Sequence, residues 1–447
     1  MKKMSMRFAI AIALGLCLCV SVGLLSSPLR AQTTSGTVDG TVTDASGAVV
    51  SGAQVTLTSL GTGTASTVTT GADGLYGFVN LAPGNYRLDV DNSGFKHFRR
   101  DPIVVQVQQT AHVDVALQVG AQSQTVEVTA ETPLLQPETS SLGQVIEERE
   151  TNEIPLNGRN VFNLITLSPA AIAQGGSGGS PVGQNPFSWG NYQVGGSFGN
   201  ESAEYVDGQP VNIGYINLPI LIPDVDSISE FKVQYNNLGP EWGKFAGGVV
   251  NLSTKGGTND YHGEAYEYLR NKVLNARPFF DTSNPPYVQN QYGGNFGGPI
   301  IKNHTFFFFA YDGYRQRAST VFTTTVPTEA ERGGVFPANI YDPLSVSAAC
   351  VATPSAGACG RTQFPNNTIP TSELNPAALL ELKFIPLPTD PNAATNNFSS
   401  AAASGGNTNQ YVARVDQNLT PNQHIFARYN FFNLLDLPTD PFGTGLC

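Results

Sequence analysis

The sequence is poor in charged residues and in histidine, and each scarcity excludes a class of protein. Charged residues make up 13% of the 447 residues, and the net charge of −11 argues against a nucleic-acid partner, which needs a basic face. The five histidines are scattered, with no second histidine or glutamate at metal-ligand spacing. No nucleophile elbow, Walker loop or zinc-protease motif occurs either. We therefore expect a protein that is not an enzyme and has no metal site and no cofactor.

Long apolar runs are also missing, except at the N-terminus. Three basic residues among the first seven precede an apolar run from Phe8 to about Leu25, and Ala31 offers a small residue for cleavage. This pattern predicts a secretory signal peptide over residues 1–31, with an uncleaved transmembrane anchor as the alternative. No later stretch approaches about 20 apolar residues, which excludes a helical membrane protein but not one that crosses the membrane with strands.

Cysteine is rare, and its placement leaves one candidate pair. Cys17 and Cys19 lie in the predicted signal peptide and Cys447 is the last residue, so Cys350 and Cys359 remain. An exported chain can oxidise such a pair. A disulfide within an external loop is one interpretation, and two unpaired thiols are the other.

The abundant residues are those of strands and turns, including 47 Gly, 30 Pro, 25 Phe and 16 Tyr. From Gly36 to about Gly120, short alternating segments recur between turn signals such as Asp44-Ala-Ser-Gly47 and Ala72-Asp-Gly74. Short strands at this regular spacing predict a β-sandwich. The expected strands cover residues 37–43, 53–59, 66–70, 75–79, 85–90, 103–107 and 111–117.

Four phrases of this region resemble the carboxypeptidase regulatory-like domain. They are Gly40-Thr-Val-Thr-Asp44, Gly52-Ala-Gln-Val55, Ala72-Asp-Gly-Leu-Tyr-Gly-Phe78 and Leu81-Ala-Pro-Gly-Asn-Tyr86. The resemblance implies a transthyretin-like sandwich, grouped with carbohydrate-binding-like folds, that has no catalytic residues of its own. Tyr76, Phe78 and Tyr86 could stack on a sugar, but aromatic residues that alternate on sandwich strands are expected in the core.

The segment Gln124-Thr-Val-Glu-Val-Thr-Ala130 follows the predicted sandwich and precedes a polar linker over residues 131–141. It resembles a TonB box, a peptide that adds its backbone to the edge of a partner's sheet. The alternative is that this segment is the last strand of the sandwich. The first position of a TonB box is usually acidic, whereas it is Gln124 here. The TonB-box candidates are Thr125, Val126, Val128 and Ala130.

Residues 138–258 mix helix and strand signals. Asn160 is expected to cap a helical turn that ends before Pro169, Tyr205-Val-Asp-Gly-Gln-Pro210 to form a hairpin with an Asp-Gly turn, and residues 228–235 and 246–255 to form strands. Five phrases in this order resemble the plug domain of TonB-dependent receptors. They are Pro155-Leu-Asn-Gly-Arg-Asn160, Asn191-Tyr-Gln-Val-Gly-Gly196, Tyr205-Val-Asp-Gly208, Ile228-Ser-Glu-Phe-Lys-Val233 and Gly247-Gly-Val-Val-Asn-Leu-Ser-Thr-Lys-Gly256.

The plug resemblance implies an α+β domain that sits inside a large barrel and blocks its lumen. A free-standing α+β domain is the alternative, but it leaves the strand signals of the following residues unexplained. The residues that carry the plug motif are Gly158, Arg159, Asn160, Asp207, Gly208, Gly247 and Gly248.

Strand signals with one apolar and one polar face follow the plug region. In residues 291–300, Tyr292, Phe296 and Ile300 share one face, and Gln291 and Asn295 share the other. The same alternation returns in residues 410–418 and 424–431. It predicts strands of an antiparallel transmembrane β-barrel with the apolar face outward.

The run Phe306-Phe-Phe-Phe309 fits such a strand if Phe307 and Phe309 face lipid while Phe306 and Phe308 pack against the plug. A buried strand of a soluble core is the alternative. The Pro/Ala/Asn/Thr-rich stretch after Tyr314 predicts a long outer loop, which contains both candidate cysteines.

The predicted fold is therefore mainly β. It comprises a signal peptide over 1–31, a carboxypeptidase regulatory-like β-sandwich over 32–120, a linker and plug over 121–258, and the first strands and outer loops of an incomplete β-barrel over 259–447. A transporter barrel of about 22 strands, each of about 10 residues, needs several hundred residues. We therefore expect the sequence to be a fragment of a longer protein or the product of an interrupted gene.

Together, these segments resemble the Oar-like branch of TonB-dependent receptors. The resemblance implies an outer-membrane protein, with sandwich and plug on the periplasmic side, that binds an external substrate and admits it through the plugged barrel. Its partners would be a TonB-type energy-coupling protein, outer-membrane lipid and the substrate. The alternative is a secreted or surface carbohydrate-binding or adhesive β-protein, which would have no outward apolar band.

Overall fold

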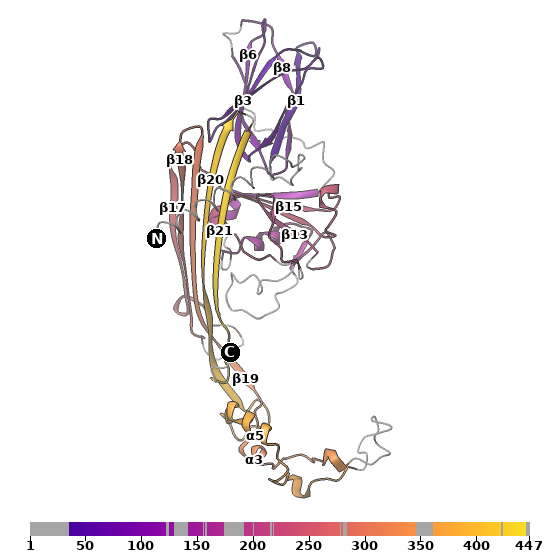
Figure 1. The fold of residues 1–447 in the computed structure, drawn as a ribbon, viewed down its shortest axis with the longest axis vertical. Helices are drawn as coiled ribbons and strands as arrows, with labels where there is room; N and C mark the ends of the chain where they lie inside the picture. The colour runs from indigo at the N-terminus through magenta and orange to yellow at the C-terminus, as the bar shows by residue number, and fades with distance from the viewer. Residues whose placement is uncertain are drawn as a thin grey trace, which may run out of the picture.

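The computed structural model describes residues 35–121, 125–128, 142–154, 156, 159–173, 192–199, 201–214, 217, 219–277, 279, 284–345, 361–421 and 423–443. In chain order these residues form a β-sandwich, a central unit and a five-stranded sheet, with an outer unit inserted between two strands of that sheet (Figure 1). The predicted signal peptide lies outside them. None of the helices described is long and apolar enough to cross a membrane.

The β-sandwich consists of two sheets with strand orders β4-β1-β7, with β8 also on β1, and β3-β2-β5-β6-β9. Tyr76, Phe78 and Tyr86 are buried in the core between them, as the alternation predicts, and are not available to stack on a sugar. The strands are β1 (Gly36–Asp44), β2 (Gln54–Ser59), β3 (Ala65–Thr69), β4 (Leu75–Leu81), β5 (Gly84–Asp91), β6 (His97–Val105), β7 (Thr110–His112), β8 (Val115–Leu117) and β9 (Thr125–Val128).

Two sandwich strands differ from the prediction. Strand β6 begins at His97 instead of Ile103, because residues 98–100 also pair with β5. The single strand expected over 111–117 divides at Val113 into β7 and β8, which both run parallel to β1. Val113 lies against Gly40, where an added Cβ would be 2.6 Å from the Val113 carbonyl carbon, so this crossing requires glycine.

The central unit is built on a sheet with the strand order β10-β15-β16-β13-β14, in which β13 runs parallel to β16. Its core contains Phe162, Phe231 and Leu252, all fully buried. The elements are β10 (Leu142–Glu147), α2 (Glu148–Glu153), η2 (Val161–Leu167), β11 (Ala171–Ala173), β12 (Tyr192–Val194), β13 (Ala203–Val206), β14 (Gln209–Pro210), η3 (Val225–Ser227), β15 (Ile228–Tyr235), η4 (Pro240–Trp242) and β16 (Val249–Thr254).

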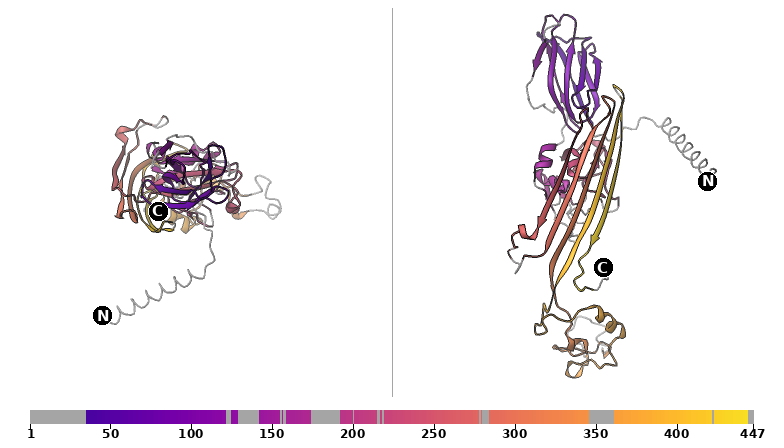
Figure 2. Two further views of the ribbon diagram at one scale, coloured as in Figure 1. Left: turned by 90° about the horizontal axis from the view of Figure 1, so that it is seen from above. Right: turned by 90° about the vertical axis from the view of Figure 1, so that its left-hand side faces the viewer.

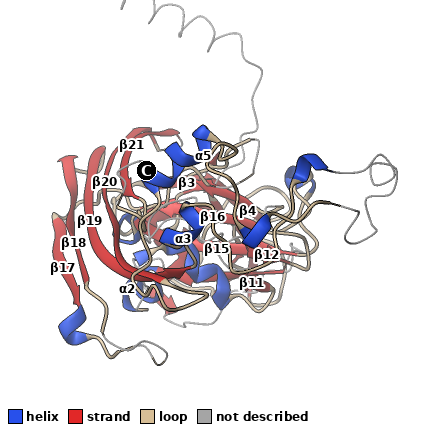
Figure 3. Cartoon of the chain, turned by 90° about the horizontal axis from the view of Figure 1, so that it is seen from below, coloured by secondary structure: helices blue, strands red, loops and turns tan. Residues whose placement is uncertain are grey.

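The five-stranded sheet is antiparallel throughout, and its strands are adjacent in chain order. It curves around one side of the central unit, which is clear from below (Figure 3) and from the side (Figure 2). Strand β20 is longer than the strand predicted over 410–418, because the Ala-, Ser- and Gly-rich residues before it also pair with β19. The elements are β17 (His262–Asn271), η5 (Lys272–Leu274), β18 (Tyr287–Ile301), β19 (Thr305–Thr324), β20 (Phe398–Thr420) and β21 (Gln423–Leu437).

The outer unit connects β19 to β20 and lies at the opposite end of the molecule from the β-sandwich (Figure 1). It occupies the stretch predicted to be a long loop, and the structure places short helices there. Cys350 and Cys359 lie outside the described residues, so their disulfide stays a prediction. The helices are α3 (Glu329–Arg332), η6 (Pro343–Ser345), η7 (Pro365–Asn367), α5 (Pro376–Glu381) and η8 (Leu382–Phe384).

Candidate functional site

The five-stranded sheet turns its polar face toward the central unit and its apolar face outward. The outward side chains of Phe296 and Tyr429 are 49% and 66% exposed, whereas a water-soluble protein buries most large apolar side chains. The polar side chains of the inner face are buried, and they belong to Gln289, Gln291, Asn295, Asp312, Gln316, Thr408, Gln410, Arg414 and Asp416.

The phenylalanine run of β19 has the two faces that the sequence predicts. Phe306 and Phe308 are buried, each 1% exposed, whereas Phe309 is 44% exposed. Phe309 pairs with the outward Phe296 on the neighbouring strand. The alternation therefore continues through four consecutive aromatic residues, and only their position in the strand decides which of them is buried.

Asp207 and Gly208 form the predicted hairpin turn between β13 and β14, with φ of 48° and 79°. Positive φ at both central residues is the geometry for which Asp-Gly is preferred. The Asp207 carboxylate accepts hydrogen bonds from the backbone N–H of Thr254 at 2.9 Å and from its hydroxyl at 2.6 Å. These bonds hold the carboxylate at the end of β16, on the side that meets the five-stranded sheet.

Two arginines of the five-stranded sheet reach this carboxylate. Arg428 Nε lies 3.0 Å from Asp207 Oδ2, and Arg414 Nη1 lies 3.5 Å from Asp207 Oδ1. Arg414 also pairs with Asp416 at 2.8 Å and donates to the Thr254 carbonyl at 2.9 Å. Because these groups are almost completely buried, removing one partner leaves an uncompensated charge, which typically costs about 3–5 kcal/mol.

Arg159 makes a second charged contact between the central unit and the sheet. Its guanidinium forms an ion pair with Asp226 at 2.5 Å and lies 4.9 Å and 4.6 Å from the ring centroids of Tyr266 and Tyr268 on β17. The Tyr266 hydroxyl donates to Asp312 of β19 at 2.8 Å. The two motif residues Arg159 and Asp207 therefore contact different strands of the same sheet.

The remaining motif residues act within the central unit. Asn160 caps η2, and its side chain accepts a hydrogen bond from Phe162 N at 3.0 Å. An added Cβ at Gly247 would lie 2.9 Å from the Glu201 carbonyl carbon, and one at Gly248 would lie 2.9 Å from the Gln234 carbonyl oxygen. Both positions therefore need glycine for close approach of the backbone. Gly158 lies outside the described residues.

The β-sandwich contacts the central unit through the turn after β6. Val107 N donates to Glu230 Oε2 at 2.7 Å, and Lys232 Nζ donates to the carbonyls of Val107 and Gln108 at 3.0 Å and 3.1 Å. Burial lowers the pKa of Lys232. The β-sandwich also contacts the short-turn end of the five-stranded sheet, where Asn418 donates to Thr64 at 2.7 Å.

The TonB-box candidate lies at the edge of the β-sandwich. Thr125, Val126 and Val128 belong to β9, which runs parallel to β6 and is the outermost strand of its sheet. Ala130 lies outside the described residues. The structure thus gives the segment the conformation of the alternative, a last sandwich strand, and its role in binding TonB stays a prediction.

Several residues of the contact were not singled out from the sequence. The alternation over residues 410–418 and 424–431 puts Arg414 and Arg428 on the polar face, but it does not indicate their shared partner Asp207. No local pattern indicates the cluster of Arg159 with Asp226 and Tyr266 either. An arginine at an inward position of a sparsely charged sheet is the signal that could have found them, because a buried arginine needs an acidic partner. Within the ranges described, no group of three His, Cys, Asp or Glu residues is arranged to hold a metal.

Comparison with known proteins finds matches at both ends of the chain. The model of the carboxypeptidase regulatory-like domain matches residues 37–118, and that of the outer membrane beta barrel domain matches residues 253–446. The TonB-dependent transporter Oar of Myxococcus xanthus is 27% identical over 310 residues, which are 65% of this chain and 28% of that protein. The chain therefore corresponds to well under half the length of this relative.

Solved structures are similar over shorter parts. A putative carbohydrate binding protein from Bacteroides uniformis is 19% identical, with 19% of this chain and 41% of that chain covered and a TM-score of 0.17. Catechol 1,2-dioxygenase from Pseudomonas arvilla is 12% identical, with 26% and 60% covered and a TM-score of 0.18. Scores this low relate neither the whole fold nor an activity.

Proposed function

Since the chain is a relative of a TonB-dependent transporter and carries an outer membrane beta barrel domain, we propose that it forms part of an outer-membrane transporter whose central unit is the plug. The observation that carries this proposal is the reversed polarity of the five-stranded sheet. Its apolar side chains point away from the protein and its polar side chains point toward the central unit, as in strands that separate lipid from a polar lumen.

The contacts of the central unit support the role of a plug. Asp207 joins it to the five-stranded sheet through ion pairs with two arginines, and Arg159 joins it through cation–π contacts with two tyrosines of β17, whereas its main apolar core is internal. The ion pairs and hydrogen bonds of this contact can be replaced by water when it separates. That property is needed in a plug that must open and close.

The two ends of the sheet support an orientation. Outer-membrane barrels have short periplasmic turns and longer external loops. The turn between β18 and β19 is short and lies beside the β-sandwich, whereas the outer unit lies at the other end (Figure 1). We therefore assign the β-sandwich to the periplasm and the outer unit to the external side, where a substrate would bind.

We also assign residues 125–130 as the segment bound by a TonB-type partner. In the described part of the chain, β9 has one neighbouring strand, β6. The other edge of β9 can pair with a partner's strand by β-augmentation. On this assignment a pull on β9 would reach the central unit through the connection to β10.

Removing the central unit tests this function. When these residues are expressed as part of a complete barrel in bacterial outer membranes, deletion of residues 142–254 should leave an open pore and admit a hydrophilic antibiotic that is too large for ordinary porins. Antibiotic sensitivity and dye uptake measure the effect. Deletion of residues 36–120 is the matched control and should leave the pore closed. Equal amounts of both variants in the outer membrane, with no gain in permeability for the first, would contradict the proposal.

A further inference from the structure

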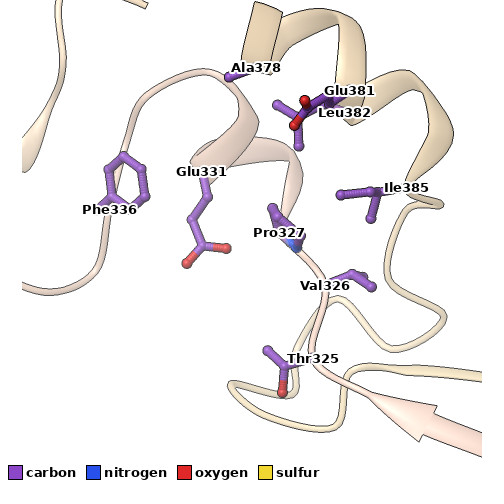
Figure 4. A pocket seen from close by; sticks show the side chains of 9 residues that line it. All are labelled: Thr325, Val326, Pro327, Glu331, Phe336, Ala378, Glu381, Leu382 and Ile385. Atoms are coloured by element: carbon purple, nitrogen blue, oxygen red, sulfur yellow. The ribbon is translucent and has the colours of Figure 1, made fainter. Parts of the chain in front are cut away.

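The outer unit contains a cavity of about 460 Å³ (Figure 4). Ligand-binding pockets typically enclose about 300–1,000 Å³ and are mostly apolar, with a few polar groups. This cavity has that character, because most of the residues that line it are apolar. They come from both ends of the outer unit. The apolar residues are Val326, Pro327, Phe336, Leu382 and Ile385.

Hydrogen bonds fix the walls of the cavity relative to one another. The Arg332 guanidinium at the end of α3 donates to the carbonyls of Leu382 and Ile385 at 2.8 Å and 2.9 Å. On the other wall, Val326 N and Val326 O bond to the side chain of Asn397 at 2.8 Å and 2.9 Å. The cavity is therefore held open by contacts that involve no ligand, which lowers the entropy cost of binding one.

The charged residues that line the cavity are both acidic. Glu331 is held by a capping box in which its Oε2 accepts from Thr328 N at 2.8 Å and from the Thr328 hydroxyl at 2.9 Å. The side chain of Glu381 has no hydrogen bond or ion pair to any residue that the structure describes. The nearby Arg332 is committed to backbone carbonyls, so it does not neutralise these carboxylates by direct pairing.

We propose that this cavity binds small amphiphilic cations, that is, an apolar group that carries an ammonium or guanidinium. The apolar walls would bury the body of the ligand, and Glu331 and Glu381 would pair with its charge. An anionic ligand would be repelled by both carboxylates. This proposal names a substrate class for the proposed transporter. It rests on the proposed function only where it treats the bound ligand as the molecule that is transported.

Three probes of matched shape test the charge preference. With the intact protein in lipid nanodiscs and empty nanodiscs as the blank, calorimetry should show 4-phenylbutylammonium binding tightest, 4-phenylbutan-1-ol more weakly and 4-phenylbutanoate weakest. A single partly exposed ion pair contributes up to about 1 kcal/mol, so we expect Glu381→Gln to weaken ammonium binding about three- to fivefold. The alcohol should be unaffected by this substitution, because it carries no charge.

Two further variants separate the site from general effects of charge and folding. Glu331→Gln keeps the capping box, because glutamine can also serve at its third position, and should weaken ammonium binding by a similar factor. Glu329→Gln removes an acid of the same helix that does not line the cavity and should change nothing. Equal binding of all three probes, or an equal loss in Glu329→Gln and Glu381→Gln, would overturn the proposal.

The binding measurements test the cavity separately from the permeability experiment, which tests the transporter. Binding that depends on Glu381, in a protein whose permeability does not respond to deletion of residues 142–254, would support the site and reject the transporter. A gated pore without charge-selective binding would reject the site alone.

Discussion

The β-sandwich and the five-stranded sheet use the same alternation of apolar and polar residues, but they turn it in opposite directions. In the β-sandwich, Tyr76 and Phe78 are buried between the two sheets. In the five-stranded sheet, Phe296 and Phe309 point outward, while Gln291 and Asp312 are buried against the central unit. A period of two shows that a strand has two faces, and the surroundings decide which face is covered.

The two regions are stabilised by different interactions. The β-sandwich excludes water from an apolar core, so its stability depends on buried apolar area. The inner face of the five-stranded sheet has a small apolar cluster of Phe308, Ala310 and Val412 and also buries Phe306 and Tyr314. Most of its other buried side chains are polar, and some of them form ion pairs with the central unit. Replacing a buried charge or placing a charge on the outward face should therefore destabilise the five-stranded sheet, whereas a charge on the outside of the β-sandwich should be tolerated.

The largest effect is expected where the inner face loses a charge. Arg414→Met removes the guanidinium that pairs with Asp416 and Asp207, and it should destabilise the protein by about 3 kcal/mol because buried carboxylates lose a partner. Urea unfolding of the intact protein in lipid vesicles measures this loss. The double variant Arg414→Met with Asp416→Asn should recover part of it, because the unpaired charge is removed as well. An equal loss in both variants would show that packing, and not charge, is the cause.

An effect of similar size, or smaller near the membrane surface, is expected on the outer face. Phe309→Arg places a charge on the outward side, which typically costs about 2–4 kcal/mol at the middle of a membrane and less near its surface. The matched control is Val79→Arg on the outside of the β-sandwich, where Val79 is 67% exposed and the change should stay within about 0.5 kcal/mol. Membrane insertion and the urea midpoint measure both variants. Similar small effects for the two arginines would argue against a lipid-facing surface.

Most of the strands could be predicted from the sequence, because alternation and turn residues are local signals. The Asp207-Gly208 turn and the faces of residues 291–300 follow from such signals. The start of β6 and the first half of β20 could not be predicted in this way. Residues 98–100 and 398–409 lack clear alternation, and their strand conformation depends on pairing with β5 and β19.

The candidate site was predictable only in part. The motif phrases identified Arg159 and Asp207, but their partners lie as far as 221 positions away in the chain, as for Asp207 and Arg428. Long-range pairs of this kind are set by how the central unit lies on the sheet, which no local pattern encodes. A last sandwich strand was one of the two interpretations of residues 124–130, but its neighbour could not be predicted, because β7 and β8 lie between β6 and β9 in the chain.

The smallest effect is expected at a partly exposed charged group of the β-sandwich. His112 Nδ1 lies 2.8 Å from Asp39, and its Nε2 lies 3.2 Å from Asp114. The hydrogen bond to Asp39, followed by the charge of Asp114, raises the pKa of His112 above 6.5. A raised pKa in the folded state stabilises the β-sandwich below the unfolded pKa, and this contribution disappears as the pH rises through the folded value.

Because His112 is about one third exposed, screening by solvent should limit this contribution to a few tenths of a kcal/mol. Pulse proteolysis of the intact protein in urea, with peptides from residues 36–120 as the readout, should show slightly greater stability at pH 5.5 than at pH 8.5. Other groups also titrate in this range, so His112→Gln serves as the control. This variant should lose only the part of the stability difference between pH 5.5 and pH 8.5 that depends on His112. An identical pH dependence in both proteins would show that the two ion pairs of His112 contribute nothing to the stability of the β-sandwich.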